Sequence, residues 1–234
     1  MERVTSGVEG LDRMLSGGLI GGRTYLVIGG PGAGKTILCM QYLMEGVRLG
    51  DRCLYVALEE QGQELKEDMA TFGWDLQRIK ILDTMQDIAS GLWALKTTSS
   101  IAKPEFNMRT LVEAIRTIIL ANKVKRIVID SLTSIRALYE NRSEARREML
   151  GFLNFLESTG CTTLLTSELT GPELIMEEFL ASGVIKIHLL ESEGERVSAI
   201  RVEKMRGSNF DKHMRPLRIT DKGIVVFPSD SVFG

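Results

Sequence analysis

The stretch TYLVIGGPGAGKTIL, residues 24–38, is the part of the sequence that decides the fold. Its first five residues are β-branched, aromatic or aliphatic, which is typical of a buried strand. Residues 29–36, GGPGAGKT, match the complete phosphate-binding signature G-x-x-x-x-G-K-[ST], and an apolar helical pattern follows over residues 37–47. The sequence therefore predicts a strand, a phosphate-binding loop and a helix in that order.

This loop predicts a binding site for a nucleoside triphosphate. Glycines let main-chain N–H groups approach phosphate oxygens, and the start of the following helix adds positive potential there. We expect Lys35 to reach the β- and γ-phosphates and Thr36 to offer its hydroxyl to Mg²⁺. A glycine-rich turn with an exposed lysine is the simpler alternative, but it does not require the complete signature. The loop residues expected to bind the nucleotide are Gly30, Pro31, Gly32, Ala33, Gly34, Lys35, Thr36 and Ile37.

The composition is that of one globular α/β domain covering residues 1–234. Hydrophobic residues make up 44% of the chain, and the formal net charge of −2 gives no general attraction to nucleic acid or anionic membrane. No apolar run approaches the roughly 20 residues of a membrane span, and the N-terminus lacks the apolar segment of a signal peptide. Three cysteines in apolar contexts fit buried thiols in a reducing compartment. We therefore expect a cytoplasmic protein.

Strand and helix patterns alternate after the loop. The near-continuous apolar run at residues 53–58 predicts a strand buried on both faces, as in a parallel sheet. Residues 79–82, 126–130 and 162–166 predict further strands. Apolar residues at helical spacing lie between these runs, and also before the loop in residues 11–19. Residues 85–106 have no clear pattern, and the polar segment within them at 96–103 predicts an exposed loop.

The C-terminal part has a different pattern. Residues 184–190 and 197–203 predict one hairpin, and residues 217–220 and 224–227 predict another, because short polar links with glycine separate the strands of each pair. The predicted fold class is therefore α/β, with a mainly parallel central sheet flanked by helices and antiparallel strands at the C-terminal end.

Carboxylates end two of the predicted strands at the edge where open α/β sheets bind ligands. Asp130 can hold Mg²⁺ directly or through water, although a lone Asp at this position more simply marks a strand end. Glu59 and Glu60 can orient and polarise an attacking water. The alternative for this pair is a solvated acidic start of a helix.

Two further pairs of residues have both a simple and a functional interpretation. Thr166 and Ser167 end another strand, where a hydroxyl could contact the γ-phosphate or merely form a turn. Lys204 and Arg206 are two residues apart on a strand, so they project to the same side. Their spacing alone favours a solvated strand face over a charged clamp on the transferring phosphoryl group.

Several segments, taken in order, resemble the KaiC-type branch of the RecA-superfamily ATPases. They are SGVEGLDRMLSGGL (6–19), GGPGAGKT (29–36), VALEE (56–60), FGWDL (72–76), VIDSLTS (128–134), SAIRVEKMRG (198–207) and TDKGIVVFP (220–228). The resemblance covers nearly the whole chain and corresponds to a single copy of the domain. It implies a RecA-like P-loop NTPase core that assembles into a ring, commonly hexameric, with ATP between neighbouring subunits.

The resemblance also implies roles for individual residues. It assigns Glu59 as the catalytic carboxylate with Glu60 assisting, and it places Phe72 against the adenine. Lys204 and Arg206 match the pair that reaches the γ-phosphate of a neighbouring subunit. Other contacts from that adjacent subunit are matched by Met205, Ser208, Thr220 and Asp221. The implied cofactors are ATP or ADP with Mg²⁺.

One segment departs from the family pattern. Members that phosphorylate themselves carry adjacent Ser and Thr before the strand that corresponds to residues 184–190, whereas residues 177–181 here read EEFLA. We therefore expect no self-phosphorylation at this position.

The leading hypothesis is a Mg²⁺-dependent ring ATPase with a regulatory or signalling role. One alternative is a nucleic-acid-binding RecA relative whose loop at 96–103 faces the strand, although the net acidity and the lack of an aromatic-plus-basic cluster argue against it. Another is a slow, nucleotide-gated scaffold for a protein partner.

Overall fold

We describe the fold from a computed structural model of the chain, which describes residues 1–84, 106–168, 175–192 and 194–232. The expected loop at 96–103 lies outside the described residues. Among these residues, no helix combines the length and apolar character needed to cross a bilayer.

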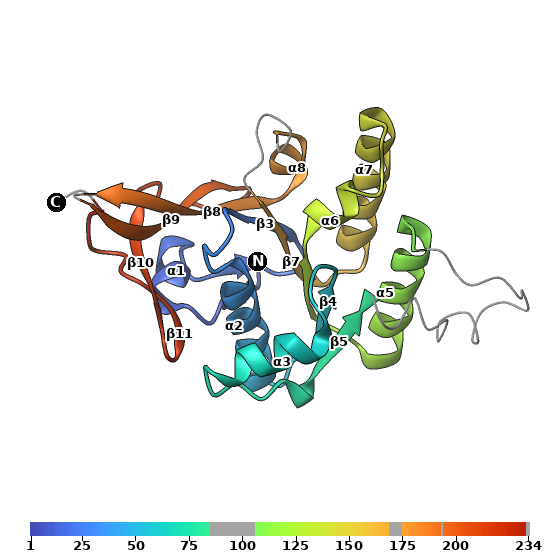
Figure 1. Ribbon diagram of the computed structural model, residues 1–234, viewed down its shortest axis with the longest axis horizontal. Coiled ribbons are helices and arrows are strands. Elements are labelled where there is room, and N and C mark those ends of the chain that lie inside the picture. The colour runs from blue at the N-terminus through green and yellow to red at the C-terminus, as the bar shows by residue number, and fades with distance from the viewer. Residues whose placement is uncertain (85–105, 169–174, 193, 233–234) are drawn as a thin grey trace, which may run out of the picture.

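The central feature is a nine-stranded sheet with the order β11-β10-β9-β8-β3-β7-β6-β4-β5 (Figure 1). Strands β3 to β8 run parallel, whereas β9, β10 and β11 are joined antiparallel, which confirms the predicted fold class. The strands are β3 (Thr24–Gly29), β4 (Cys53–Ala57), β5 (Ile79–Asp83), β6 (Arg126–Asp130), β7 (Thr162–Ser167), β8 (Gly183–Ser192), β9 (Glu195–Met205), β10 (Arg215–Thr220) and β11 (Gly223–Val226).

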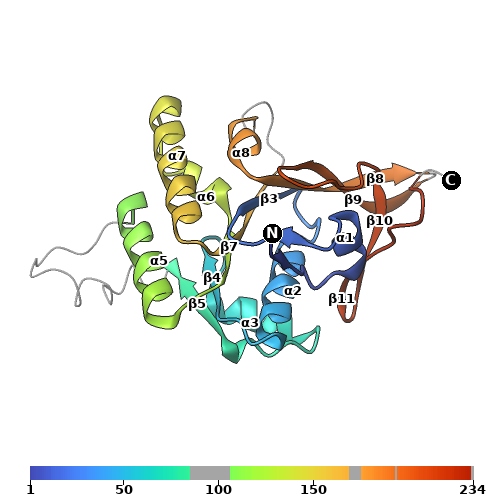
Figure 2. The same ribbon diagram turned by 180° about the vertical axis from the view of Figure 1, so that it is seen from behind.

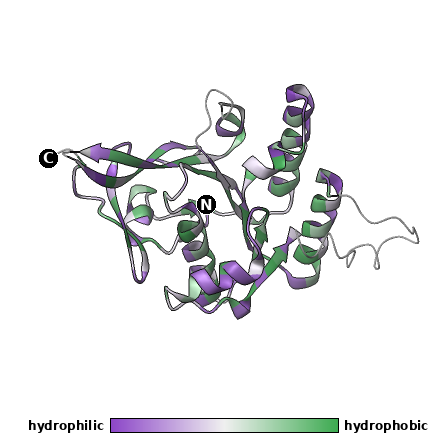
Figure 3. Cartoon of the chain, in the orientation of Figure 1, coloured by the Kyte–Doolittle hydropathy of each residue, from purple (hydrophilic) through white to green (hydrophobic). Residues whose placement is uncertain are grey.

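Helices cover both faces of the sheet (Figures 1 and 2). On one face lie α1 (Glu9–Met14), α2 (Lys35–Arg48) and α3 (Gly62–Ala70), and on the other lie α5 (Met108–Asn122), α6 (Leu132–Arg136), α7 (Arg142–Ser158) and α8 (Ile175–Leu180). Successive side chains of β4 point to opposite faces of the sheet. Tyr55 packs in the core beneath α2, whereas Leu54 and Val56 pack in the core beneath α5. Hydrophobic colour accordingly follows the central strands in Figure 3.

Short elements were missed by the sequence patterns. Strands β1 (Arg3–Val4) and β2 (Leu19–Ile20) form a small antiparallel pair on either side of α1, and the helix α6 follows β6 almost directly. A 3₁₀ turn, η1 (Leu76–Arg78), precedes β5. The two strands are only two residues long and α6 has five, so none of them displays a full period of apolar residues.

The strand register brings the residues that follow each parallel strand to one edge of the sheet. Ala57, two residues before Glu59, is level with Asp130, and Ile28, just before the loop, is level with Ser167. The loop and the predicted carboxylates therefore share this edge, as expected for an open α/β sheet.

Candidate functional site

The phosphate-binding loop connects β3 to α2 through two glycines in left-handed conformations. All six residues of β3 are buried, and Gly32 and Gly34 have φ angles of 72° and 94°. A side chain at Gly34 would also approach Ile219, because an added Cβ would lie 3.0 Å from its Cδ1 atom. The positive φ angle of Gly34 and this close contact explain why the residue at position 34 is a glycine.

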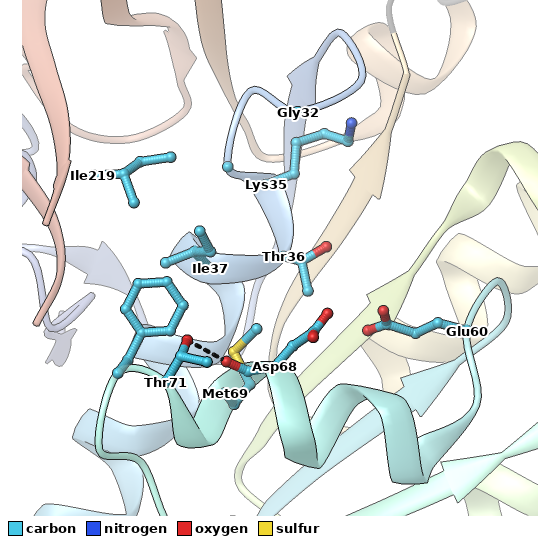
Figure 4. A pocket seen from close by; sticks show the side chains of 11 residues that line it. Gly32, Lys35, Thr36, Ile37, Glu60, Asp68, Met69, Thr71 and Ile219 are labelled. Atoms are coloured by element: carbon cyan, nitrogen blue, oxygen red, sulfur yellow. Dashed lines mark hydrogen bonds between the residues drawn. The ribbon is translucent and has the colours of Figure 1, made fainter. Parts of the chain in front are cut away.

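Lys35, the first residue of α2, is bound to the loop itself. Its Nζ atom donates to the carbonyl oxygens of Gly29 and Gly30 at 3.0 and 3.2 Å. In Figure 4 the lysine extends alongside the loop, while Thr36 points toward the side of the cavity that carries Asp68 and Glu60. The ammonium group therefore lies beside the loop where a phosphate would be expected.

Asp130 is the centre of a hydrogen-bond cluster formed by four elements. Its Oδ2 atom accepts from Thr36 Oγ1 of α2 at 2.8 Å and from the Tyr55 hydroxyl of β4 at 2.6 Å. Its Oδ1 atom accepts from Thr166 Oγ1 of β7. Asp130 is 8% exposed, and two of its three donors, Tyr55 and Thr166, are fully buried, so the carboxylate is held in place at the edge of the sheet.

The Thr36 hydroxyl and the Asp130 carboxylate are hard oxygen ligands of the kind that Mg²⁺ prefers. The described part of the chain contains no cluster of three or more His, Cys, Asp and Glu side chains arranged to hold a metal ion. The residues therefore fit a Mg²⁺ ion that takes its remaining ligands from water and phosphate oxygens, as Mg²⁺ does in ATPases.

The two glutamates after β4 lie in different environments. Glu59 is exposed, and its Oε1 atom accepts from Ser131 Oγ and, at 2.9 Å, from Ser134 Oγ. Glu60 is partly buried, and its Oε1 atom is shielded from solvent without a hydrogen-bond donor among the described residues. Burial, together with repulsion from Asp130 and other nearby carboxylates, raises the pKa of Glu60 to about 7. Glu60 can therefore change its protonation state near neutral pH.

A cavity of about 370 Å³ lies beside the loop (Figure 4). Its lining comes from the loop, from α2, from the link between β4 and α3, from α3 and the residues after it, and from the end of β10. The lining residues are Gly32, Gly34, Lys35, Thr36, Ile37, Glu60, Asp68, Met69, Thr71, Phe72 and Ile219. Volume and lining are compatible with a ligand of nucleotide size.

Phe72, the predicted adenine contact, lines this cavity and stacks on Trp74 with ring centroids 5.0 Å apart. Beside it, Thr71 Oγ1 donates to the carbonyl oxygen of Asp68 at 2.6 Å. The sequence patterns missed Asp68, Met69, Thr71 and Ile219 as lining residues. Thr71 directly precedes the FGWDL motif, which is the signal that could have identified it, whereas nothing local marks Ile219.

The other residues predicted to contact nucleotide lie in several places. Ser167 is buried at the end of β7, whose Thr166 binds Asp130. Thr220 and Asp221 follow Ile219 at the turn between β10 and β11, so within one chain this turn borders the cavity. Met205 is buried in the core, and Ser208 accepts from Arg3 at 2.6 Å. One chain therefore does not gather these predicted contacts around a single point.

Lys204 and Arg206 lie toward the opposite end of the sheet from the loop. The main-chain N–H of Arg206 donates to Ser182, and that of Ser182 donates to Thr24, the first residue of β3. Gly29, where the loop begins, lies five residues along β3 from Thr24. At the usual rise per residue of a β-strand, this separation is roughly 16 Å. Within one chain, this pair is therefore separated from the phosphate-binding loop.

Both cations are bound to the last turn of α8. Lys204 Nζ donates to the carbonyl oxygens of Glu178 and Phe179 at 2.8 and 2.7 Å, and Arg206 donates to that of Phe179 at 2.6 Å. Burial and the charge of Arg206 lower the pKa of Lys204, while Glu178 opposes the shift. The pair thus satisfies carbonyl groups that a helix end leaves without partners.

The chain is similar to several known proteins. The family model described as ATPase: KaiC matches residues 4–231. A UPF0273 protein of Pyrococcus furiosus is 33% identical over 240 residues, which cover 97% of this chain and 95% of the relative. The circadian clock oscillator protein KaiC of Acaryochloris marina is 33% identical over 244 residues, which cover 97% of this chain and 44% of that protein.

A solved structure also points to this family. The crystal structure of a KaiC-like protein from Pyrococcus horikoshii superposes with a TM-score of 0.83 at 33% identity, covering 97% of this chain and 99% of the other. Family model, full-length relatives and solved structure all point to one assignment. The chain belongs to the KaiC-type ATPase family.

Proposed function

We propose that this protein is a Mg²⁺-dependent ATPase that works in the cytoplasm as a ring of identical subunits, hexameric as the family resemblance implies, with a regulatory or signalling role. The observation that carries the proposal is the 2.8 Å hydrogen bond between Thr36 and Asp130. It joins the end of the phosphate-binding loop to a strand-end carboxylate from a distant part of the chain, as a nucleotide–metal site requires.

Each residue at this edge has a defined task in the proposal. The loop amides and Lys35 bind the phosphates, and Thr36 and Asp130 hold the Mg²⁺ ion. When bound, the ion neutralises the negative charge of the β- and γ-phosphates. Glu59, exposed at the same edge, orients the attacking water, and Glu60 is available to accept a proton because its pKa lies near neutrality.

The arrangement of Lys204 and Arg206 supports sites that are shared between subunits. In their own chain the two cations bind α8, toward the opposite end of the sheet from the loop. A neighbouring subunit in a ring would present this end of its sheet to the nucleotide, so that the cations reach the γ-phosphate. There they would stabilise the charge that develops during phosphoryl transfer.

Mixing two inactive variants tests this proposal. Lys35→Ala removes phosphate binding and Arg206→Ala removes the cation offered to the neighbour, so rings of either variant alone should be inactive. In mixed rings, some interfaces join an intact loop to an intact arginine, and ATP hydrolysis should partly return. Mixed assembly is verified by affinity tags on each variant. Verified mixed rings that remain inactive would contradict shared sites, and a wild-type chain that binds no ATP would contradict the ATPase proposal itself.

A further inference from the structure

Tyr55 directs a buried hydroxyl at the carboxylate of Asp130, and neither the loop signature nor the family motifs account for it. The side chain lies in the middle of β4 and is fully buried. Its hydroxyl donates to Asp130 Oδ2 at 2.6 Å. A hydrogen bond to an ionised acceptor is short and strong compared with one between neutral groups.

Two other fully buried tyrosines provide an internal comparison. The hydroxyls of Tyr25 and Tyr42 bond main-chain carbonyl oxygens, those of Ile20 and Thr162, each at 2.8 Å. Such bonds satisfy a buried hydroxyl and connect neighbouring segments. Tyr55 instead bonds the carboxylate that, in our proposal, serves the metal ion. Packing alone would not require its hydroxyl to have this partner.

The position of the donors defines how the carboxylate is oriented. Tyr55 on β4 and Thr166 on β7 flank β6 and bond opposite oxygens of Asp130. Both donors belong to strands that are paired on both sides, so they fix the plane of the carboxylate between them. Burial, reinforced by the charge of Asp130, raises the pKa of Tyr55 well above its ordinary value, so the hydroxyl stays a donor.

We propose that Tyr55 is a positioning residue that fixes the Asp130 carboxylate for the divalent ion of the nucleotide site. This inference rests on the proposed function, because it requires Asp130 to serve that ion. Partners that orient metal-binding groups commonly contribute about 10- to 100-fold to metal affinity. Because Thr166 remains as a second donor, we expect Tyr55 to contribute roughly 10-fold, at the low end of that range.

The test compares Tyr55→Phe with Tyr42→Phe in the full chain, since each change removes one fully buried hydroxyl and little else. Binding of the non-hydrolysable analogue AMP-PNP is measured by calorimetry in EDTA and over a series of Mg²⁺ concentrations. In Tyr55→Phe, the Mg²⁺ concentration that half-maximally tightens binding should rise about 10-fold. Affinity in EDTA should stay at the wild-type value, and Tyr42→Phe should match the wild type in both conditions.

A double-mutant cycle separates positioning from packing. In an Asp130→Asn background, Tyr55→Phe should have no further effect on the Mg²⁺ dependence, because the group it orients no longer binds the ion as a carboxylate. Equal losses in Tyr55→Phe and Tyr42→Phe, or an unchanged Mg²⁺ dependence in folded Tyr55→Phe, would overturn the inference. If Tyr55→Phe does not fold, the same measurements are made with Thr166→Val, which removes the other flanking donor. An unchanged Mg²⁺ dependence in that variant would also contradict the idea that flanking donors position the Asp130 carboxylate. Wild-type protein without Mg²⁺-dependent AMP-PNP binding would instead refute the proposed function.

Discussion

The two ends of the parallel strands present their charged residues in contrasting ways. At the carboxyl end, Thr36, Tyr55, Asp130 and Thr166 come from four elements and bond one another directly. Toward the amino end, the side chains of Lys204 and Arg206 bond the end of a short helix. One end is assembled within a single chain, whereas the other acquires a catalytic purpose in our proposal only when a second copy is present.

Removing Arg206 at the amino end should cause the greatest loss of activity. Arg206→Ala should lower kcat by about 10³-fold or more, as removal of an arginine finger does, while ATP affinity changes little. Steady-state hydrolysis and equilibrium ATP binding separate these quantities. Arg218→Ala, on the neighbouring hairpin, is a matched control because its guanidinium lies over Phe227 instead of α8. A fall in affinity that matches the loss of kcat would show that Arg206 acts in ground-state binding.

The second prediction concerns Asp130, at the carboxyl end of the parallel strands. Asp130→Asn keeps the shape of the side chain but removes its charge, so we expect hydrolysis to fall about 10²- to 10³-fold. The dependence of nucleotide binding on Mg²⁺ should weaken, whereas binding in EDTA should persist because Lys35 and the loop remain. Calorimetry with and without Mg²⁺ checks this difference. Equal affinity losses in the two conditions would mean that Asp130 supports the loop and does not serve the ion.

A smaller effect is expected at the side of the cavity where we expect Phe72 to contact the adenine. Aromatic pairs contribute about 0.5–1.5 kcal/mol beyond their burial, so Trp74→Leu should weaken ATP binding by roughly 2- to 10-fold. The reason is that Phe72 loses the ring on which it stacks. Phe155→Leu is the matched control, since Phe155 stacks on Phe152 in the helical layer on the other face. The dissociation constant for ATP is measured for both variants. Equal changes in this constant would indicate a general loss of stability.

The smallest effect concerns stability and pH at Glu60. Its pKa is raised from 4.5 to about 7, so between these values the folded chain retains a proton that the unfolded chain releases. The contribution of protonated Glu60 to the free energy of unfolding is fully present below about pH 4.5 and is lost as the pH rises through 7. Glu60→Gln cannot ionise, so it should be more stable than wild type above pH 7. Thermal melting of nucleotide-free protein in EDTA measures this, with Glu157→Gln, an exposed glutamate on α7, as control. Parallel pH profiles for wild type and Glu60→Gln would contradict the raised pKa.

Sequence reasoning predicted what local pattern specifies and missed what depends on distant packing. The loop signature and the strand-end aspartate led to Thr36 and Asp130, which the structure brings to 2.8 Å. From the sequence alone, Tyr55 is simply one residue of an apolar strand, because its role depends on which face of β4 it occupies. Ile219 was missed for another reason: it reaches the cavity only because the β10–β11 hairpin extends to the loop. Pairing within a hairpin does not define where its turn will lie.

That hairpin has a thermodynamic consequence. A Cβ on Gly223 would lie 2.8 Å from Trp74 Cζ2, and Gln41 bonds both main-chain groups of Ile224, so the turn contacts α2 and the segment after α3. In the sheet, β11 forms one margin and β5, which follows Trp74, forms the other. A ligand bound between these segments would raise the free energy of their separation by its binding energy. Amide hydrogen exchange in α3 and in β10–β11 should therefore slow together on saturation with nucleotide, although these regions are some 150 residues apart.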